Sequence, residues 1–287
     1  MCIRDRDLAL KRFLQLNKNG LIVGLDADTI VEKNYLNSIY THFKKHNNTA
    51  VSIHFEHPIS GGYADDHYQL ICSYELHLRY YKNALSFVGF PFAFHTIGSA
   101  FALTALAYAR QGGMNRRKAG EDFYFINKLI KGEDFGEINN TKVIPSSRIS
   151  DRVPFGTGRA MLEAKNNKKD LSYTYSFNAF LELKKWIDLI QRNELDYHAF
   201  PKSVQAFLNE KTWLKKKNEL TKNTLNHASL VKRFFNIFDA FWVLKFVHFY
   251  RDNIQSNEKL LDCVNRLLQL NAGTVSYTHL RAHETVV

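Results

Sequence analysis

Short runs of apolar residues alternate with longer segments in which apolar residues recur every three or four positions. The longer segments predict helices over residues 7–16, 34–45, 65–85, 104–111 and 121–130. The short runs predict strands over 21–25, 50–55, 87–103 and 141–144. Strand 21–25, helix 34–45 and strand 50–55 follow one another, which predicts a parallel βαβ unit. The first part of the chain is therefore expected to be an α/β domain.

The pattern changes near residue 160, where strand signals end and Lys-rich helical stretches begin. We therefore predict a domain over 7–159 and a helical extension over 160–274. Within the extension, residues 231–247 combine basic and aromatic side chains. Such a stretch suits an anionic membrane surface, but we favour packing against the α/β domain or a neighbouring helix.

Composition and charge limit the partners and the cellular compartment to be expected, and they do not identify a function. The chain has 287 residues and a formal net charge of +11, which suits anionic partners such as nucleotides, diphosphates or an acidic membrane face. The three cysteines are far apart and form no zinc spacing or disulfide framework, so a reducing compartment is expected. We find neither a signal peptide nor an apolar run long enough to span a membrane. These features predict a cytoplasmic location, with peripheral contact at the inner membrane surface as an option.

Two carboxylates, Asp26 and Asp28, directly follow the predicted strand 21–25. Ligands of open α/β sheets bind at the carboxyl ends of strands. Adjacent carboxylates repel each other unless a cation lies near them, and Mg²⁺ or Mn²⁺ held there is able to bind a phosphate. The alternative is a plain turn that caps the next helix.

A second acidic pair, Glu121 and Asp122, opens the predicted helix 121–130. Acidic residues in a first turn are favoured by the helix dipole alone, by about 0.3–1 kcal/mol. The cations at 116–118, Arg117 among them, precede the pair. They suggest an alternative in which the cations attract an anionic donor and one carboxylate deprotonates an acceptor hydroxyl.

Other candidate residues lie in the apolar run 87–103 and in the loop 145–158. His95 stands alone in an apolar run, which is more typical of a core histidine than of a ligand, and Gly98-Ser99 would allow close backbone approach to a ligand. Residues 145–158 form a long loop of the kind that often closes over a site. Its Arg148 and Arg152 are candidates for phosphate contacts or are simply solvated charges.

Taken together, these motifs resemble those of family-2 glycosyltransferases. The resemblance rests on Leu25-Asp26-Ala27-Asp28 after a strand, Gly120-Glu121-Asp122 at a helix start, and the intervening Phe94–Ser99 and Gly112-Gly113-Met114. The segments 55–58 and 150–158 also look like a bacterial subgroup of this family. The similarity covers roughly residues 7–160.

The resemblance implies a GT-A fold and inverting, metal-dependent transfer of a sugar from a nucleotide-diphosphate sugar to an acceptor hydroxyl. Asp28, with Asp26, would hold Mg²⁺ or Mn²⁺; Asp122 would be the general base, with Glu121 beside it. The donor and acceptor would contact Asp26, His95, Gly98, Ser99, Arg117 and Arg152. The acceptor would be a glycan or a lipid-linked molecule, as in cell-surface polysaccharide synthesis.

Two departures from the family pattern bear on this expectation. Only one helix precedes the Asp-Ala-Asp strand, where the family has a first βα unit that holds the nucleobase. Residues 1–6 and 275–287 resemble translated sequencing-adapter read-through, so both ends are expected to be non-native and the gene to be cut on its N-terminal side. The Gln-x-x-Arg-Trp motif of processive polymerases is absent, which favours addition of a single sugar.

Two other classes of protein compete with this interpretation. An apolar strand followed by Asp-x-Asp also resembles haloacid-dehalogenase-like phosphatases, with Asp26 as nucleophile and Asp28 as acid. That pattern requires Thr or Val where Ile30 stands, and an acidic run that 120–123 does not match. A basic helical module that binds nucleic acid or membrane is supported by net charge alone, without a nucleic-acid-binding motif. We therefore expect an enzyme that binds no nucleic acid.

Overall fold

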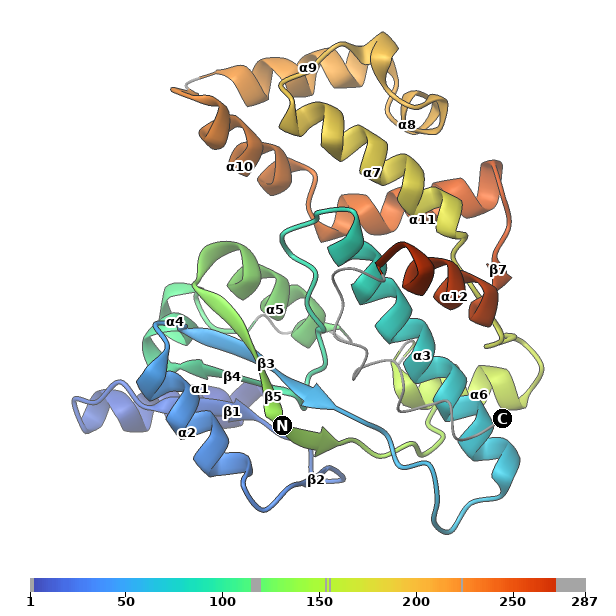
Figure 1. The fold of residues 1–287 in the computed structure, drawn as a ribbon. Helices are drawn as coiled ribbons and strands as arrows, with labels where there is room; N and C mark the ends of the chain where they lie inside the picture. Colours follow the sequence, from blue (N-terminus) through green and yellow to red (C-terminus); the bar gives the residue numbers. More distant parts are fainter. Residues whose placement is uncertain (1–2, 115–119, 153, 155, 223, 272–287) are drawn as a thin grey trace. The chain divides into compact units, whose positions relative to one another are not determined.

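A computed structural model describes residues 3–114, 120–152, 154, 156–222 and 224–271 (Figure 1). The chain forms two compact units. The first unit comprises Met1–Glu75 and Phe94–Asp170, and the second comprises Leu76–Ala93 and Leu171–Val287. The long helix α3 (Asp65–Phe87) therefore begins in the first unit and ends in the second. The boundary predicted between an α/β domain ending at residue 159 and a helical extension beginning at residue 160 stays a prediction.

The first unit contains a five-stranded mixed sheet in the order β1-β4-β3-β5-β2. The strands are β1 (Leu21–Gly24), β2 (Ile30–Val31), β3 (Ala50–Phe55), β4 (Phe101–Thr104) and β5 (Phe135–Ile144). β4 is antiparallel to both β1 and β3, whereas β3 and β5 are parallel. The predicted βαβ unit is thus correct in strand direction but wrong in pairing, because β4 lies between β1 and β3. The coarse α/β class is confirmed.

Helices flank this sheet; those at 35–45, 105–110 and 121–132 lie within two residues of the predicted bounds, whereas the first helix begins earlier than predicted and the helix at 157–165 was not predicted. They are α1 (Ile3–Gln15), α2 (Tyr35–Lys45), α4 (Ala105–Arg110), α5 (Glu121–Gly132) and α6 (Thr157–Lys165). The Thr104 hydroxyl accepts a hydrogen bond from the Ala107 N–H and so caps α4. Gly112 follows that helix with φ 71°, a conformation that favours glycine. α2 packs on β5, and α1 contacts both β1 and α4.

The prediction of continuous strand over 87–103 is wrong. Only residues 101–104 form a strand; α3 extends to Phe87, and the residues up to 100 form turns and irregular backbone. Gly89 adopts φ 78° and Pro91 lacks a backbone donor, so neither residue suits a central strand. The apolar side chains Phe90 and Ala93 are buried nonetheless. The apolar run in the sequence therefore indicates that these residues are buried, but it does not indicate that their backbone is extended.

β5 is longer than predicted, because residues 135–138 pair with β3 ahead of the predicted 141–144. The polar pair Asn139-Asn140 interrupts the apolar pattern and conceals this continuity. The buried side chains of the first unit come from the sheet and from helices α2 to α6, and include Ile22, Ile39, Val51, Ile53, Phe55, Ile71, Phe101, Leu103, Tyr108, Phe125, Leu129, Val143 and Met161.

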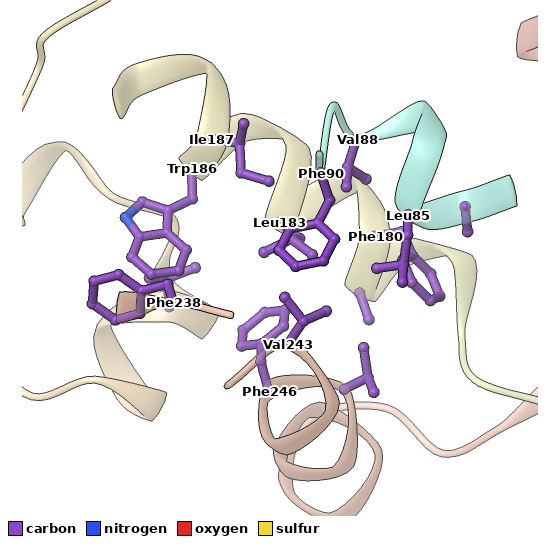
Figure 2. Packing of buried hydrophobic residues seen from close by; sticks show 14 of the residues in the cluster. Leu85, Val88, Phe90, Phe180, Leu183, Trp186, Ile187, Phe238, Val243 and Phe246 are labelled. Atoms are coloured by element: carbon purple, nitrogen blue, oxygen red, sulfur yellow. The ribbon is translucent and has the colours of Figure 1, made fainter. Parts of the chain in front are cut away.

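The second unit is mainly helical and has an aromatic core (Figure 2). Besides the end of α3, it contains α7 (Phe177–Gln191), a 3-10 turn at Tyr197–Ala199, α8 (Lys202–Phe207), α9 (Glu210–Thr221), α10 (His227–Ile237), α11 (Ala240–Asn253) and α12 (Leu260–Asn271). Two short strands, β6 (Tyr173–Thr174) and β7 (Glu258–Lys259), pair antiparallel and were not predicted. In the basic and aromatic stretch 231–247, Phe234, Phe238 and Phe246 are buried in this core. The stretch thus packs against neighbouring helices.

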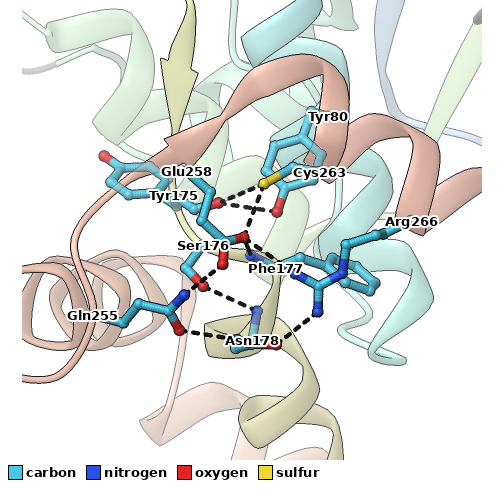
Figure 3. Close-up of polar contacts among 9 residues, drawn as sticks. All are labelled: Tyr80, Tyr175, Ser176, Phe177, Asn178, Gln255, Glu258, Cys263 and Arg266. Carbon is cyan, nitrogen blue, oxygen red and sulfur yellow. Dashed lines mark hydrogen bonds and ion pairs between the residues drawn. The ribbon is translucent and has the colours of Figure 1, made fainter.

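A polar cluster joins the start of α7 to β7 and α12 (Figure 3). Glu258 Oε2 accepts hydrogen bonds from the Phe177 N–H (3.2 Å) and from Arg266 Nη1 (3.3 Å). Arg266 Nη2 donates in turn to Asn178 Oδ1 at 2.7 Å. The Cys263 thiol lies 3.3 Å from the same Glu258 oxygen. One carboxylate therefore ties together segments far apart in the sequence.

The buried thiol of Cys263 is expected to be chemically inert. Burial, reinforced by the Glu258 carboxylate, raises the pKa of this thiol to about 12, so little thiolate forms near neutral pH. In the folded protein at pH 8, iodoacetamide should modify Cys72, which is partly exposed, and leave Cys263 unmodified. Peptide mass spectrometry, with a urea-unfolded sample as the control, measures both sites. Equal labelling of the two cysteines in the folded protein would contradict this packing.

Candidate functional site

The two carboxylates after β1 lie on an exposed turn of the first unit. The Thr29 N–H donates to the Asp26 carbonyl at 3.1 Å, which closes the turn, and both Asp26 and Asp28 are exposed. β1 is a buried neighbour of β4, so the sheet fixes the start of this turn. The structure thus places both carboxylates at the carboxyl end of β1, as the sequence predicted.

Asp28 forms an ion pair with Arg148, whose Nε lies 2.6 Å from Asp28 Oδ2. Both side chains are partly exposed, at 41% for Asp28 and 47% for Arg148, so this contact contributes at most about 1 kcal/mol to stability. Its importance is positional, because it brings the segment after β5 to the Asp26–Asp28 turn. Both arginines considered as phosphate ligands in this loop are exposed, and Arg148 is the one that contacts the Asp26–Asp28 turn.

The segment between β5 and α6 is also held at two further points. Ser147 Oγ lies 3.0 Å from His67 Nε2, and Thr157 Oγ1 lies 3.3 Å from His57 Nε2. The buried Glu75 carboxylate accepts from the His57 backbone N–H at 2.6 Å and contacts His57 Nδ1 at 2.8 Å. Sequence reasoning missed these residues as a group, since their contacts join positions far apart in the chain.

Glu75→Gln should destabilise the first unit. The charged carboxylate faces two groups of His57, and a neutral amide satisfies them less well; the expected cost is about 2 kcal/mol in the free energy of unfolding. Urea unfolding monitored by circular dichroism measures this loss. Asp151→Asn, at an exposed carboxylate of the same unit, is the comparison; an equal effect of the two changes would show that the buried contact with His57 contributes nothing.

Asp122 lies in the first turn of α5 with its carboxylate beside Gly98. A Cβ atom built on Gly98 would lie 2.3 Å from Asp122 Oδ2 and 3.0 Å from Asp122 Cβ, so only glycine fits. A Cβ on Gly24, at the end of β1, would in turn lie 2.8 Å from the Gly98 carbonyl oxygen. Three segments, the end of β1, the loop at 98 and the start of α5, therefore meet at one place. Sequence alone suggested Gly98 only as a site of close backbone approach to a ligand and did not single out Gly24.

Burial raises the pKa of the Asp122 carboxyl, with the neighbouring Glu121 charge acting in the same direction. The Phe123 N–H donates to Asp122 Oδ1 at 2.8 Å and opposes that rise. A carboxylate whose pKa is raised towards neutrality is a stronger base when ionised. Asp122 therefore has the electrostatic setting of a candidate general base.

The guanidinium of Arg6 is buried beside the loop that contains Gly98. Arg6 is 3% exposed, lies 5.1 Å above the Phe101 ring, and its Nη2 is 3.5 Å from the Gly98 carbonyl oxygen. Burial lowers the pKa of Arg6, whereas the charges of Asp122, Asp26 and Glu121 raise it. These three carboxylates therefore act electrostatically on one buried cation.

The remaining predicted site residues are His95, Ser99 and Arg117. His95 packs edge-on against Phe55, with ring centroids 5.0 Å apart, and Ser99 is buried. His95 thus has an aromatic contact typical of a core histidine. Arg117 lies outside the described residues, as do the ends 1–2 and 275–287.

The chemistry of the Asp26–Asp28 turn fits a divalent cation. Within the described residues, no group of three or more His, Cys, Asp or Glu side chains forms a metal site. Mg²⁺ often binds through one or two carboxylates and completes its shell with water and substrate phosphates, so two exposed aspartates suffice. The Arg148 contact at Asp28 shows that this turn already attracts positive charge.

Comparisons with protein-family models, curated proteins and solved structures returned no match. In the described part of the chain, every helix is too short or too polar to cross a membrane.

Proposed function

We propose that this protein is an inverting glycosyltransferase with a GT-A-like fold. It would transfer one sugar from a nucleotide-diphosphate sugar to a hydroxyl of a glycan or lipid-linked acceptor, without processive synthesis. Support comes from the motif resemblance together with the arrangement of the first unit. The single observation that carries the proposal is the meeting of the end of β1, the loop at Gly98 and the start of α5, which sets the Asp122 carboxylate against Gly98.

Asp122 would act as the general base. Its carboxylate would accept the proton of the acceptor hydroxyl as that oxygen attacks the sugar carbon, a role that contributes about 10²–10⁴-fold to rate. Glu121 would position the acceptor or the base. The backbone at Gly98 and Ser99 would line the acceptor side, where a larger residue at 98 would displace Asp122.

Asp28, with Asp26, would hold the donor diphosphate through a divalent cation. A bound Mg²⁺ or Mn²⁺ would act as a Lewis acid that offsets negative charge on the departing nucleoside diphosphate. Arg148, at 2.6 Å from Asp28, is placed to add a guanidinium to the same phosphates. Metal removal with EDTA should therefore weaken donor binding.

A donor-hydrolysis assay tests the proposal. The protein is incubated with a panel of UDP- and GDP-sugars, with Mn²⁺ or with EDTA, and release of the nucleoside diphosphate is measured with and without acceptor sugars. We expect metal-dependent release from one donor class that an acceptor accelerates. Hydrolysis of p-nitrophenyl phosphate with no release from any nucleotide sugar would instead support a phosphatase, and would overturn the proposal.

A further inference from the structure

Helix α9 of the second unit has an outer face that carries exposed lysines and one exposed leucine. Trp213 and Leu220 are buried and define its inner face. Lys211, Leu214 and Lys215 recur at helical spacing on the opposite face, and all three are exposed. Leu214 is 50% exposed, so this face is apolar as well as basic.

The apolar character continues into the connection between α9 and α10. Leu225, two residues before α10, is 96% exposed, more than any other large hydrophobic side chain in the described residues. Exposed lysines lie on both sides of it along the chain, Lys222 before it and Lys232 in α10. A single exposed leucine is ordinary on a protein surface, so Leu225 points to a partner only together with the exposed lysines that flank it in the sequence.

The acidic residues of α9 do not neutralise this basic face. Glu219 pairs with Lys216 at 3.0 Å, and Glu210 lies 3.5 Å from His198 Nε2. Among the residues that the structure describes, no ion pair involves Lys211, Lys215 or Lys222. Their charges therefore remain available to an anionic surface.

We propose that the outer face of α9 (Lys211, Leu214 and Lys215), together with Lys222 and Leu225 in the connection that follows, docks on an anionic lipid bilayer. The lysines would contact headgroups, and Leu225 would enter the boundary between headgroups and acyl chains. An aliphatic side chain suits lipid, whereas single-stranded nucleic acid is held by exposed aromatic rings on which bases stack. This inference does not rest on the proposed enzymatic activity. It also places lipid contact on α9 and the connection that follows, outside the buried aromatic stretch 231–247.

Vesicle sedimentation of the full chain tests the proposal. The vesicles are phosphatidylcholine alone and phosphatidylcholine mixed with phosphatidylglycerol. We expect binding to the mixed vesicles only, weakened by added salt. Lys211→Glu/Lys215→Glu should lower the partition coefficient about tenfold or more. The control Lys168→Glu/Lys169→Glu makes the same change in net charge on exposed residues of the first unit and should leave binding within about twofold.

Leu225→Asp separates lipid insertion from a purely electrostatic contact. We expect it to lower the partition coefficient about tenfold, whereas Leu36→Asp, at a leucine 71% exposed in the first unit, should have little effect. Circular dichroism melting of each variant confirms that it folds. Equal binding by the α9 variants and their controls would overturn the proposal. Full binding by Leu225→Asp, together with competition by a single-stranded oligonucleotide, would also overturn it in favour of nucleic acid.

Discussion

Asp122→Asn is expected to abolish sugar transfer while making the protein more stable at neutral pH. The amide keeps an oxygen for the Phe123 N–H but is not a base, so turnover should fall by about 10²–10⁴-fold with donor binding retained. The same change removes a charge that burial disfavours, and should raise the free energy of unfolding by about 1 kcal/mol. Donor-turnover assays and urea unfolding at pH 7 measure the two effects.

The effect of Asp122→Asn on the free energy of unfolding should depend on pH. Burial raises the pKa of Asp122 above its ordinary value of 3.8, so the folded protein holds this proton more tightly than the unfolded chain. The resulting stabilisation is complete below the unfolded pKa and is lost as pH rises through the folded pKa. The advantage of Asp122→Asn should therefore be present at pH 7 and vanish below about pH 4. The wild-type rate should fall as pH drops through the raised pKa, because the base becomes protonated.

Asp65→Asn is the matched control for this experiment. Asp65 also lies in the first turn of a helix, α3, but is exposed. Its removal should slightly lower stability, because the helix dipole favours a carboxylate there by about 0.3–1 kcal/mol. If Asp122→Asn and Asp65→Asn had the same effect on unfolding, burial would not govern Asp122. Full turnover by Asp122→Asn would exclude Asp122 as the base.

Gly98→Ala is expected to lower turnover about 10²-fold or more. The added methyl group would lie 2.3 Å from Asp122 Oδ2, so the carboxylate must move, and a displacement of about 1 Å is enough for a loss of this size. Donor binding at the Asp26–Asp28 turn should change little, so the loss should appear in kcat. Steady-state kinetics with donor and acceptor varied in turn make this distinction.

Gly62→Ala provides the control for added volume. A Cβ on Gly62 meets no atom within 4 Å, so this variant should match the wild type in both turnover and stability. If Gly98→Ala kept wild-type kcat, the contact between residue 98 and Asp122 would have no part in catalysis.

The helices and several strands of the first unit could be predicted because their signals are local. Thr104 before α4 and the Gly-Gly pair after it mark the ends of that helix, and β1 is a plain apolar run. Residues 87–100 were predicted wrongly because buried irregular backbone and buried strand share an apolar composition. The position of β4 between β1 and β3 depends on long-range pairing that no local pattern encodes.

The candidate site was predictable in its acidic residues and not in the residues that hold it. Asp26, Asp28 and Asp122 stand at element ends, which sequence patterns reveal. The Arg148 contact with Asp28 and the His57 contacts with Glu75 and Thr157 join distant positions by side-chain geometry alone. In the second unit, the aromatic content of 231–247 was evident, whereas its burial depends on how α7, α10 and α11 pack.

Isothermal titration of UDP and GDP tests the central proposal, that the Asp26–Asp28 turn binds a nucleoside diphosphate through a divalent cation. Each nucleotide is titrated with Mn²⁺ and with EDTA into the wild type, Asp28→Ala and the control Asp151→Ala, whose carboxylate is also exposed. We predict Mn²⁺-dependent binding of one nucleotide by the wild type and Asp151→Ala, and loss of that binding in Asp28→Ala. Binding of neither nucleotide by the folded wild type, or equal binding by Asp28→Ala, would contradict the proposed site.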